Sequence, residues 1–494
     1  MLRKLRTVLA LLFFLGITAL FLDFSGFLQH YLGWMAKLQF MPAVLSGSFL
    51  VVAFVLLMTL LFGRVYCSVV CPLGVMQDGF NLIGRKVKKG RFRFLPERRW
   101  LRYTLLALFV LLFVLGFNAI AVLIAPYSAY GRIASTLLQP VYLWINNLLA
   151  GIAERHDSYA FYHVDVWLKS GTALLVAVAT LLLVGFLALR RGRSWCNTVC
   201  PVGTVLGLFS RFALFRPVID ADRCKNCRKC EHNCKASCID IENHRIDYSR
   251  CVACMDCLEE CKFDALHFQS TRFALRPERA PQPASEAAVD NSRRRFIVTA
   301  ALAGGAAAVK AQEKRVDGGL AVVTDKQIPL RQTPIRPAGA LSQKHFENHC
   351  TSCQLCVSEC PNHVLRPSQH LEHLLQPEMS YERGFCRPEC TRCSEVCPAG
   401  AIQRISPEQK SDIHIGYAVV VPDNCLAYKG EASCGNCARH CPAEAILMVA
   451  LDGNEAVKVP SVNTERCIGC GACEYLCPAR PFSAIYVNGL QRHV

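Results

Sequence analysis

Cysteine spacing is the feature of this 494-residue sequence that most directly indicates chemistry. Of its 29 cysteines, 24 fall into six groups of four, four more form two C-x3-C-P pairs, and Cys238 is left over. Thiols grouped in this way are typical of metal or cluster ligands, whereas disulfide scaffolds belong to short secreted chains. Four thiolates hold one 4Fe–4S cluster. We therefore expect six such clusters.

The first two groups lie close together in the sequence, and both have the spacing C-x2-C-x2-C-x3-C. In two-cluster ferredoxins the first three cysteines hold one cluster and the fourth binds the other. This predicts one cluster on Cys224, Cys227, Cys230 and Cys261 and another on Cys251, Cys254, Cys257 and Cys234. Lys235 and Lys262 replace the proline that usually follows the fourth cysteine. Cys238 is either a spare ligand or a buried structural thiol.

Four further groups occupy the C-terminal part of the chain, and all end in C-x3-C-P. Their members are Cys350, Cys353, Cys356 and Cys360; Cys386, Cys390, Cys393 and Cys397; Cys425, Cys434, Cys437 and Cys441; and Cys467, Cys470, Cys473 and Cys477. They predict four more 4Fe–4S clusters. The gaps between the groups do not decide which of them exchange their fourth cysteine.

The two C-x3-C-P pairs belong to an internal repeat, G-R-x-aromatic-C-x3-C-P-x-G. One copy starts at Gly63 and the other at Gly192, so the repeat contributes Cys67, Cys71, Cys196 and Cys200. Four thiolates are enough for a metal ion or a small cluster. We expect a shared metal or redox site here, with reactive thiols, disulfides or simple packing as the alternatives.

Four apolar runs each approach or exceed the ~20 residues that cross a bilayer. They are Thr7–Leu22, Leu45–Phe62, Tyr103–Ala125 and Gly171–Leu189. The N-terminus and the loop 63–102 are rich in Lys and Arg, which predicts that both lie in the cytoplasm. The stretch from Arg85 to Arg102 alone has nine bases. It contributes to the net charge of +17 without any nucleic-acid recognition motif, so no nucleic-acid partner is expected.

The fold class we expect is multidomain: an α-helical transmembrane bundle plus α+β ferredoxin-like 4Fe–4S domains. The predicted order is a four-helix membrane domain (1–215), a cytoplasmic two-cluster module (216–270), a linker (271–290), an internal signal (291–312), a second linker (313–345) and a four-cluster domain (346–494).

The internal signal is predicted from Ser292-Arg293-Arg294-Arg295-Phe296-Ile297, which precedes an Ala-rich stretch. This run resembles a twin-arginine export signal. Because that route exports folded, cofactor-loaded domains, the C-terminal domain is expected on the periplasmic side. A basic linker followed by an Ala-rich helix is the alternative, and the small residues leave cleavage open.

The C-terminal domain resembles the NapG family of periplasmic nitrate reductase iron–sulfur subunits. The likeness rests on Gly416-Tyr-Ala-Val-Val-Val-Pro-Asp-Asn-Cys425-Leu-Ala-Tyr and on Cys467-Ile-Gly-Cys470-Gly-Ala-Cys473. Residues 1–270 resemble its membrane partner family NapH and the NosR-type membrane region, through the C-x3-C-P repeat and the two-cluster module. The two parts are usually separate chains in that family and are fused here.

The resemblance implies a nested exchange of fourth cysteines, between the first and fourth and between the second and third C-terminal groups. The implied ligand sets are Cys350, Cys353, Cys356 and Cys477; Cys467, Cys470, Cys473 and Cys360; Cys386, Cys390, Cys393 and Cys441; and Cys425, Cys434, Cys437 and Cys397. Exchange between sequential groups is the alternative.

The resemblance also implies a function: electron transfer from the membrane quinone pool to a periplasmic reductase or cytochrome, at the bacterial inner membrane. No C-x-x-C-H haem motif, dinucleotide fingerprint or reductase domain is visible, so the chain is expected to be a quinol dehydrogenase component at most. The alternative is a NosR-like maturation or regulatory electron donor to a periplasmic metalloenzyme. His30, His163 and Asp165 are candidates for the quinol site, but each could equally be a solvated loop residue.

Overall fold

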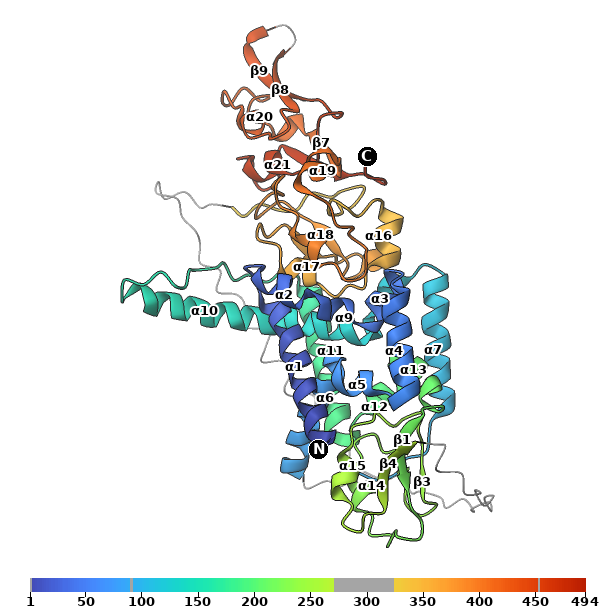
Figure 1. Cartoon of the computed structure of the whole chain (residues 1–494). Coiled ribbons are helices and arrows are strands. Elements are labelled where there is room, and N and C mark those ends of the chain that lie inside the picture. Colours follow the sequence, from blue (N-terminus) through green and yellow to red (C-terminus); the bar gives the residue numbers. More distant parts are fainter. Residues whose placement is uncertain (1, 89–91, 271–323, 452–453) are drawn as a thin grey trace, which may run out of the picture.

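The computed structural model describes residues 2–88, 92–270, 324–451 and 454–494. The predicted signal and the linker that precedes it therefore lie outside the described residues. A helical bundle forms the middle of the molecule, and a ferredoxin-like module lies at each of its two ends (Figure 1). The module of residues 216–270 lies where the first helix begins, and the C-terminal module lies where that helix ends (Figure 1).

Four helices run along the bundle: α1 (Leu2–Leu22), α4 (Phe49–Phe62), α7 (Arg99–Val114) and α11 (Gly171–Arg191). Among the helices of the described residues, α1 and α11 are long and apolar enough to cross a membrane. The second apolar run is divided between α3 (Phe40–Leu45) and α4.

The third predicted run, Tyr103–Ala125, is not one helix. Helix α7 ends at Val114, and Gly116 takes a left-handed φ of 84° that favours glycine. The short helices α8 (Asn118–Ala121) and η1 (Val122–Ile124) follow this turn. An apolar run in the sequence therefore does not by itself fix a continuous membrane-length helix.

Both copies of the internal repeat form the same pair of helices. The first copy has α5 (Val65–Val69) followed by α6 (Pro72–Lys88), and the second has α12 (Ser194–Thr198) followed by α13 (Pro201–Ser210). The second cysteine of each copy lies in the break between the two helices. The proline after it begins the next helix, where its missing N–H costs no hydrogen bond.

The opposite end of the bundle contains α2 (Phe27–Lys37), α9 (Pro126–Ile133), the π-helical turn η2 (Ala134–Leu138) and α10 (Gln139–Glu154). Helix α10 leaves the bundle sideways (Figure 1). It buries Gln139, Leu143, Asn146 and Ala150 on one stripe. Its other faces expose large apolar side chains, including Trp144 and Leu148.

The module of residues 216–270 is built on two antiparallel strand pairs and two one-turn helices. Strand β1 (Phe215–Ile219) pairs with β4 (Leu266–Ser270), and β2 (Ile239–Asp240) pairs with β3 (Arg245–Ile246). Helices α14 (Lys229–Asn233) and α15 (Asp256–Glu260) lie between them in the sequence.

The C-terminal module repeats this plan with three antiparallel strand pairs. They are β5 (Leu365–Pro367) with β6 (Pro377–Met379), β7 (Gly416–Val420) with β10 (Ile485–Gly489), and β8 (Ile446–Leu451) with β9 (Asn454–Val462). Its helices are α16 (Gln343–His349), α17 (Leu355–Ser358), η4 (Leu371–His373), α18 (Arg392–Val396), α19 (Pro407–Asp412), η5 (Pro422–Asn424), α20 (Asn436–Arg439) and α21 (Ala472–Leu476).

Candidate cluster-binding sites

The four cysteine loops with strict C-x2-C-x2-C spacing share one backbone conformation. In each loop the residues on both sides of the middle cysteine have left-handed φ: Asn226 and Arg228, Ala253 and Met255, Ser352 and Gln354, and Gly469 and Gly471. Six of these eight residues are not glycine, although the left-handed region disfavours side chains. Such turns point successive backbone N–H groups at an anionic centre, as around many iron–sulfur sites. The loops therefore fit a cluster.

In the module of residues 216–270 the cysteines meet in the expected two sets. Cys224, Cys227, Cys230 and Cys261 surround one cavity, which we call site one. Cys234, Cys251, Cys254 and Cys257 surround a second, site two. Cys238 lines site two as well, and its buried sulfur lies 3.5 Å from the sulfur of Cys234. The hydrogen bond between these two sulfurs lowers the pKa of Cys234. Cys238 is thus a buried thiol in hydrogen-bond contact with a ligand set.

In the C-terminal module the structure groups the cysteines in sequential pairs and not in the nested exchange that the resemblance implies. Site four contains Cys360, Cys386, Cys390 and Cys393 around one cavity. Site six contains Cys425, Cys434, Cys437 and Cys477 around another. Site three contains Cys350, Cys353, Cys356 and Cys397, which interact electrostatically with one another. Site five contains Cys467, Cys470, Cys473 and Cys441.

Helix packing is the physical reason for this pairing. Helix α17 packs against α18, and α20 packs against α21, so the fourth cysteine of each group lies beside the first three cysteines of the neighbouring group. The two pairs are joined where the backbone N–H of Cys386 donates to the carbonyl of Cys470 over 2.9 Å. Sites four and five are thereby brought next to each other, which places the four C-terminal sites in one series.

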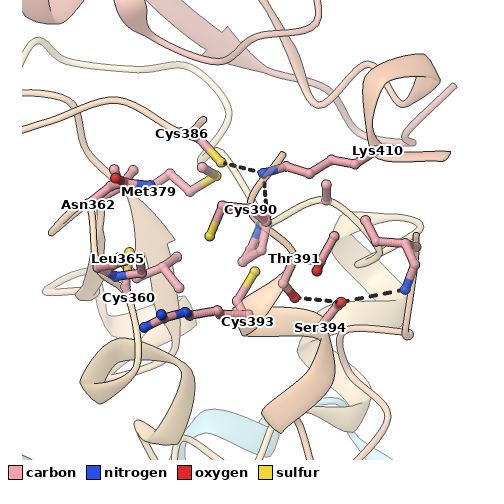
Figure 2. A pocket seen from close by; sticks show the side chains of 16 residues that line it. Cys360, Asn362, Leu365, Met379, Cys386, Cys390, Thr391, Cys393, Ser394 and Lys410 are labelled. Atoms are coloured by element: carbon pink, nitrogen blue, oxygen red, sulfur yellow. Dashed lines mark hydrogen bonds between the residues drawn. The ribbon is translucent and has the colours of Figure 1, made fainter. Parts of the chain in front are cut away.

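Site four holds a buried lysine that the sequence analysis did not identify. Lys410, on α19, donates from Nζ to Cys386 Sγ over 3.2 Å and to the carbonyl of Cys390 (Figure 2). It also donates to the carbonyl of Arg387 over 2.6 Å. Burial by itself would lower the pKa of Lys410, but the Cys386 sulfur outweighs it and raises that pKa. The lysine is therefore a positive charge fixed against one ligand.

Replacing Lys410 with Met is expected to lower the reduction potential of site four. A charge-assisted hydrogen bond of about 1.5–3 kcal/mol to a sulfur that gains negative charge on reduction corresponds to roughly 60–130 mV for one electron. Redox titration followed by electron paramagnetic resonance measures this shift. Lys410→Arg, which keeps the charge, should recover most of the potential. An unchanged potential in Lys410→Met would contradict this role.

The two copies of the repeat bring their four cysteines together in the bundle. Cys67, Cys71, Cys196 and Cys200 are all buried, and Cys200 interacts electrostatically with the other three. Gln77 donates to the sulfur of Cys196 over 3.2 Å. We call these four thiols the paired-motif site.

The repeat arginines cross between the copies in a reciprocal way. Arg64, from the first copy, donates to the carbonyl of Cys196 over 3.0 Å and to Asn197 Oδ1 over 2.7 Å in the second. Arg193, from the second copy, donates to the carbonyl of Cys67 in the first. Both arginines are fully buried. Each arginine therefore holds the cysteine loop of the opposite copy in place. This contact gives the arginine of the motif a structural role.

The final glycine of each copy allows a close approach. A Cβ on Gly74 would lie 2.4 Å from the carbonyl oxygen of Cys67, and one on Gly203 would lie 2.2 Å from that of Cys196.

Within the described ranges, no three His, Cys, Asp or Glu side chains meet closely enough to hold a single metal ion. The ferredoxin motifs and the paired-motif site give the same result, so this test does not distinguish the two kinds of site.

Lys235, which replaces the usual ferredoxin proline, attaches the module of residues 216–270 to the bundle. Its Nζ donates to Asp78 of α6 over 2.8 Å and lies 3.1 Å from Asp256. Its carbonyl accepts the backbone N–H of Arg193 over 2.7 Å. Arg193 in turn holds Asp78 through two hydrogen bonds of 2.7 and 2.8 Å. The departure from the ferredoxin pattern thus connects site two to the paired-motif site.

The C-terminal module is attached to the other end of the bundle through polar contacts beside site three. Ser135 donates to Gln354 Oε1 over 2.8 Å, and a Cβ on Gly131 would lie 2.3 Å from the carbonyl oxygen of Cys353. Tyr127 of α9 is close enough to interact electrostatically with Cys353 of site three and with Tyr66 of the first repeat copy, and Tyr66 interacts in the same way with Cys67 and Cys71. Tyr66 and Tyr127 are therefore neighbours that connect the paired-motif site with site three.

Comparison with known protein families supports cluster binding at both kinds of site. A 4Fe–4S binding domain family matches residues 44–90 and 171–219, which are the two copies of the repeat. A 4Fe–4S dicluster domain family matches residues 432–480, which include most of sites five and six. The loops, the cysteine sets and these matches define an iron–sulfur protein of the ferredoxin type.

Similar proteins with known names place the chain in a smaller family within the iron–sulfur proteins of the ferredoxin type. The chain is 34% identical over 202 residues to the ferredoxin-type protein NapG of Escherichia coli, a match that covers 38% of this chain and 81% of NapG. It is 33% identical over 167 residues to the methylamine utilization ferredoxin-type protein MauM of Methylobacillus flagellatus, which covers 32% and 70%. The chain belongs to this NapG and MauM family of ferredoxin-type proteins.

A third relative is the ferredoxin-type protein NapF of Escherichia coli, 29% identical over 155 residues, 31% of this chain and 86% of NapF. No solved structure shows a significant match to the chain. The expected resemblance to NapG is confirmed, whereas a NapH-like origin of the membrane half stays a prediction.

Proposed function

We propose that this chain is a membrane-bound electron-transfer protein that passes electrons from the quinol pool to a periplasmic reductase or cytochrome. One observation carries the proposal: ferredoxin-like modules lie at opposite ends of a bundle that contains two helices of membrane length (Figure 1). A chain that crosses the inner membrane several times would thereby keep sites one and two in the cytoplasm and sites three to six in the periplasm.

The cofactors we propose are six 4Fe–4S clusters, one in each numbered site. Bound clusters supply one-electron carriers, and the protein tunes them through hydrogen bonds, charge and burial. Backbone N–H groups of this chain donate to several ligand sulfurs, such as Ala265 to Cys261 and Ala445 to Cys441, each over 3.3 Å. These donors favour the reduced, more negative state.

The paired-motif site is proposed as a further redox centre between the two modules. Lys235 and Arg193 connect it to site two, and Tyr66 and Tyr127 lie on the way to site three. The 4Fe–4S binding domain match over both copies of the repeat supports a cluster there. Without such a centre, the bundle would separate the two modules by the thickness of a membrane.

For the electron acceptor we propose only a class of protein, a periplasmic reductase or cytochrome. One relative is named for methylamine utilization, and the name of another identifies it only as a ferredoxin-type protein. Neighbouring genes for a reductase or a multihaem cytochrome would identify the acceptor.

Topology tests this function directly. A reporter that is active only outside the cytoplasm should be active when fused after Val494 and inactive when fused after Ser270. The physical reason is that the two positions belong to modules at opposite ends of the bundle (Figure 1). Activity is measured in intact cells, with a cytoplasmic reporter at the same two positions as the control. A cytoplasmic C-terminal fusion in the unmodified protein would overturn the outward route.

A further inference from the structure

A cavity of about 330 Å³ lies between the bundle and the C-terminal module. The loop 162–169, the start of α10 and the residues that follow α17 enclose it. Its volume falls at the lower end of the range for small-molecule sites, which is about 300–1,000 Å³. Its walls mix aromatic and polar groups: Tyr162, His163, Asp165, Trp167, Lys169 and His363.

One wall of this cavity is a ligand loop. Cys360 and Pro361 line both this cavity and the cavity of site four. A molecule bound here would therefore lie directly against a cysteine of an iron–sulfur site. Of the three candidate quinol residues from the sequence, His163 and Asp165 line the cavity, and His30 is not among its lining residues.

The loop that forms the cavity is held in place by specific contacts. Asn147 of α10 exchanges two hydrogen bonds with the backbone of Val164, of 2.8 and 2.9 Å. The guanidinium groups of Arg366 and Arg383 both lie over the Trp167 ring, at 4.6 and 4.9 Å from its centre. These contacts hold the loop in one position, so the cavity is a defined part of the fold.

Helix α10 lines the cavity through Gln139, Pro140 and Leu143, and it exposes large apolar side chains on its outer surface. Trp144 and Leu148 are 64% and 54% exposed, and Val141 is 56% exposed. Helix α10 leaves the bundle sideways at the end nearest the C-terminal module (Figure 1). A helix with a wide apolar surface lying across the end of a membrane bundle is typical of the membrane interface.

We infer that this cavity is the quinol-oxidation site, with the ring of a membrane quinol against Cys360 and its apolar tail along α10. The inference rests on the proposed function and adds the place where the substrate binds. Lys169, whose Nζ lies 2.7 Å from Gln139 Oε1 at the cavity wall, supplies a donor for a ring oxygen.

Oxidation of one quinol to quinone releases two electrons and two protons. A cluster held by Cys360, Cys386, Cys390 and Cys393 would accept these electrons one at a time. The protons go to His163 and Asp165 and from there to water, because these side chains are 55% and 73% exposed. The periplasmic acceptor consumes the electrons, so the step balances.

The experiment uses the full-length, cluster-loaded protein in detergent, with decylubiquinol as the substrate and decylubiquinone as the binding probe. Val166→Trp fills the cavity, whereas Val114→Trp places the same side chain at an exposed position of α7, which does not line the cavity. His163→Gln removes one proton acceptor with little change of shape. Three quantities are measured: probe binding by tryptophan fluorescence, bleaching of the iron–sulfur absorbance by the quinol, and bleaching by dithionite.

Val166→Trp should weaken probe binding and slow quinol bleaching about tenfold or more, and Val114→Trp should not. His163→Gln should slow quinol bleaching while probe binding stays close to that of the unmodified protein. Dithionite bleaching and iron content should be unchanged in all three. If the unmodified protein is bleached by dithionite but not by quinol, the proposed function itself fails. If quinol bleaching is normal and equal in all three variants, the function stands and this site is wrong.

Discussion

Replacing Cys356 and Cys397 together with alanine is expected to remove one 4Fe–4S cluster, whereas replacing Cys356 and Cys477 together is expected to remove two. Cys356 and Cys397 belong to site three, but Cys477 belongs to site six. With four iron atoms per cluster, the first double variant should lose about four iron atoms and the second about eight, from about 24 in six clusters.

Iron and protein assays after anaerobic purification and reconstitution measure these losses, and electron paramagnetic resonance counts the reduced clusters. Both double variants share Cys356→Ala, so the difference between them reports only the second cysteine. The nested exchange predicts the opposite order, with two clusters lost in the first variant and one in the second. That result would show that the cysteine sets seen in the structure are not the ligand sets.

The cysteine loops could be predicted from the sequence because their geometry is local. Three thiolates within seven residues have few ways to face one centre, so Cys224, Cys227 and Cys230 fall together as expected. In the two-cluster module the fourth cysteine also followed the ferredoxin rule, since only two groups were present. Local spacing, however, carries no information about which of four groups become neighbours.

Nonlocal packing explains what the sequence left open. The sequential exchange depends on α17 packing against α18 and on α20 packing against α21. The role of Lys410 depends on α19 returning to site four. The cavity beside Cys360 depends on a loop from the bundle meeting the C-terminal module. None of these contacts has a periodic or motif-like signal within the segment that makes it.

The repeat combines local features that the sequence shows with nonlocal contacts that it does not show. Its periodicity and its four cysteines were visible in the sequence, and the structure brings the thiols together. What the motif could not reveal is why its arginines are needed. Arg64 and Arg193 each act on the opposite copy, so their role becomes clear only when the two copies meet.

The second prediction with a large expected effect concerns the paired-motif site. If its four thiols hold one redox centre, Cys67→Ser and Cys196→Ser should each abolish that centre, and the double variant should be no worse than either. Residues that act as one unit are non-additive in this way. The expected defect is loss of about four iron atoms if the centre is a 4Fe–4S cluster, with sites one to six still loaded.

The matched controls are Val70→Ser and Val199→Ser, which occupy equivalent positions of the two copies and remove no thiol. Iron content, resonance spectra and the rate at which electrons given to the module of residues 216–270 reach the C-terminal module are measured for all variants. In the cysteine variants transfer between modules should stop, because the bundle then holds no redox centre between site two and site three. Dithionite should still reduce each module separately. If the two cysteine changes give different, additive defects, or if transfer continues unchanged in the double variant, the four thiols do not form one centre and electrons cross the bundle by another route.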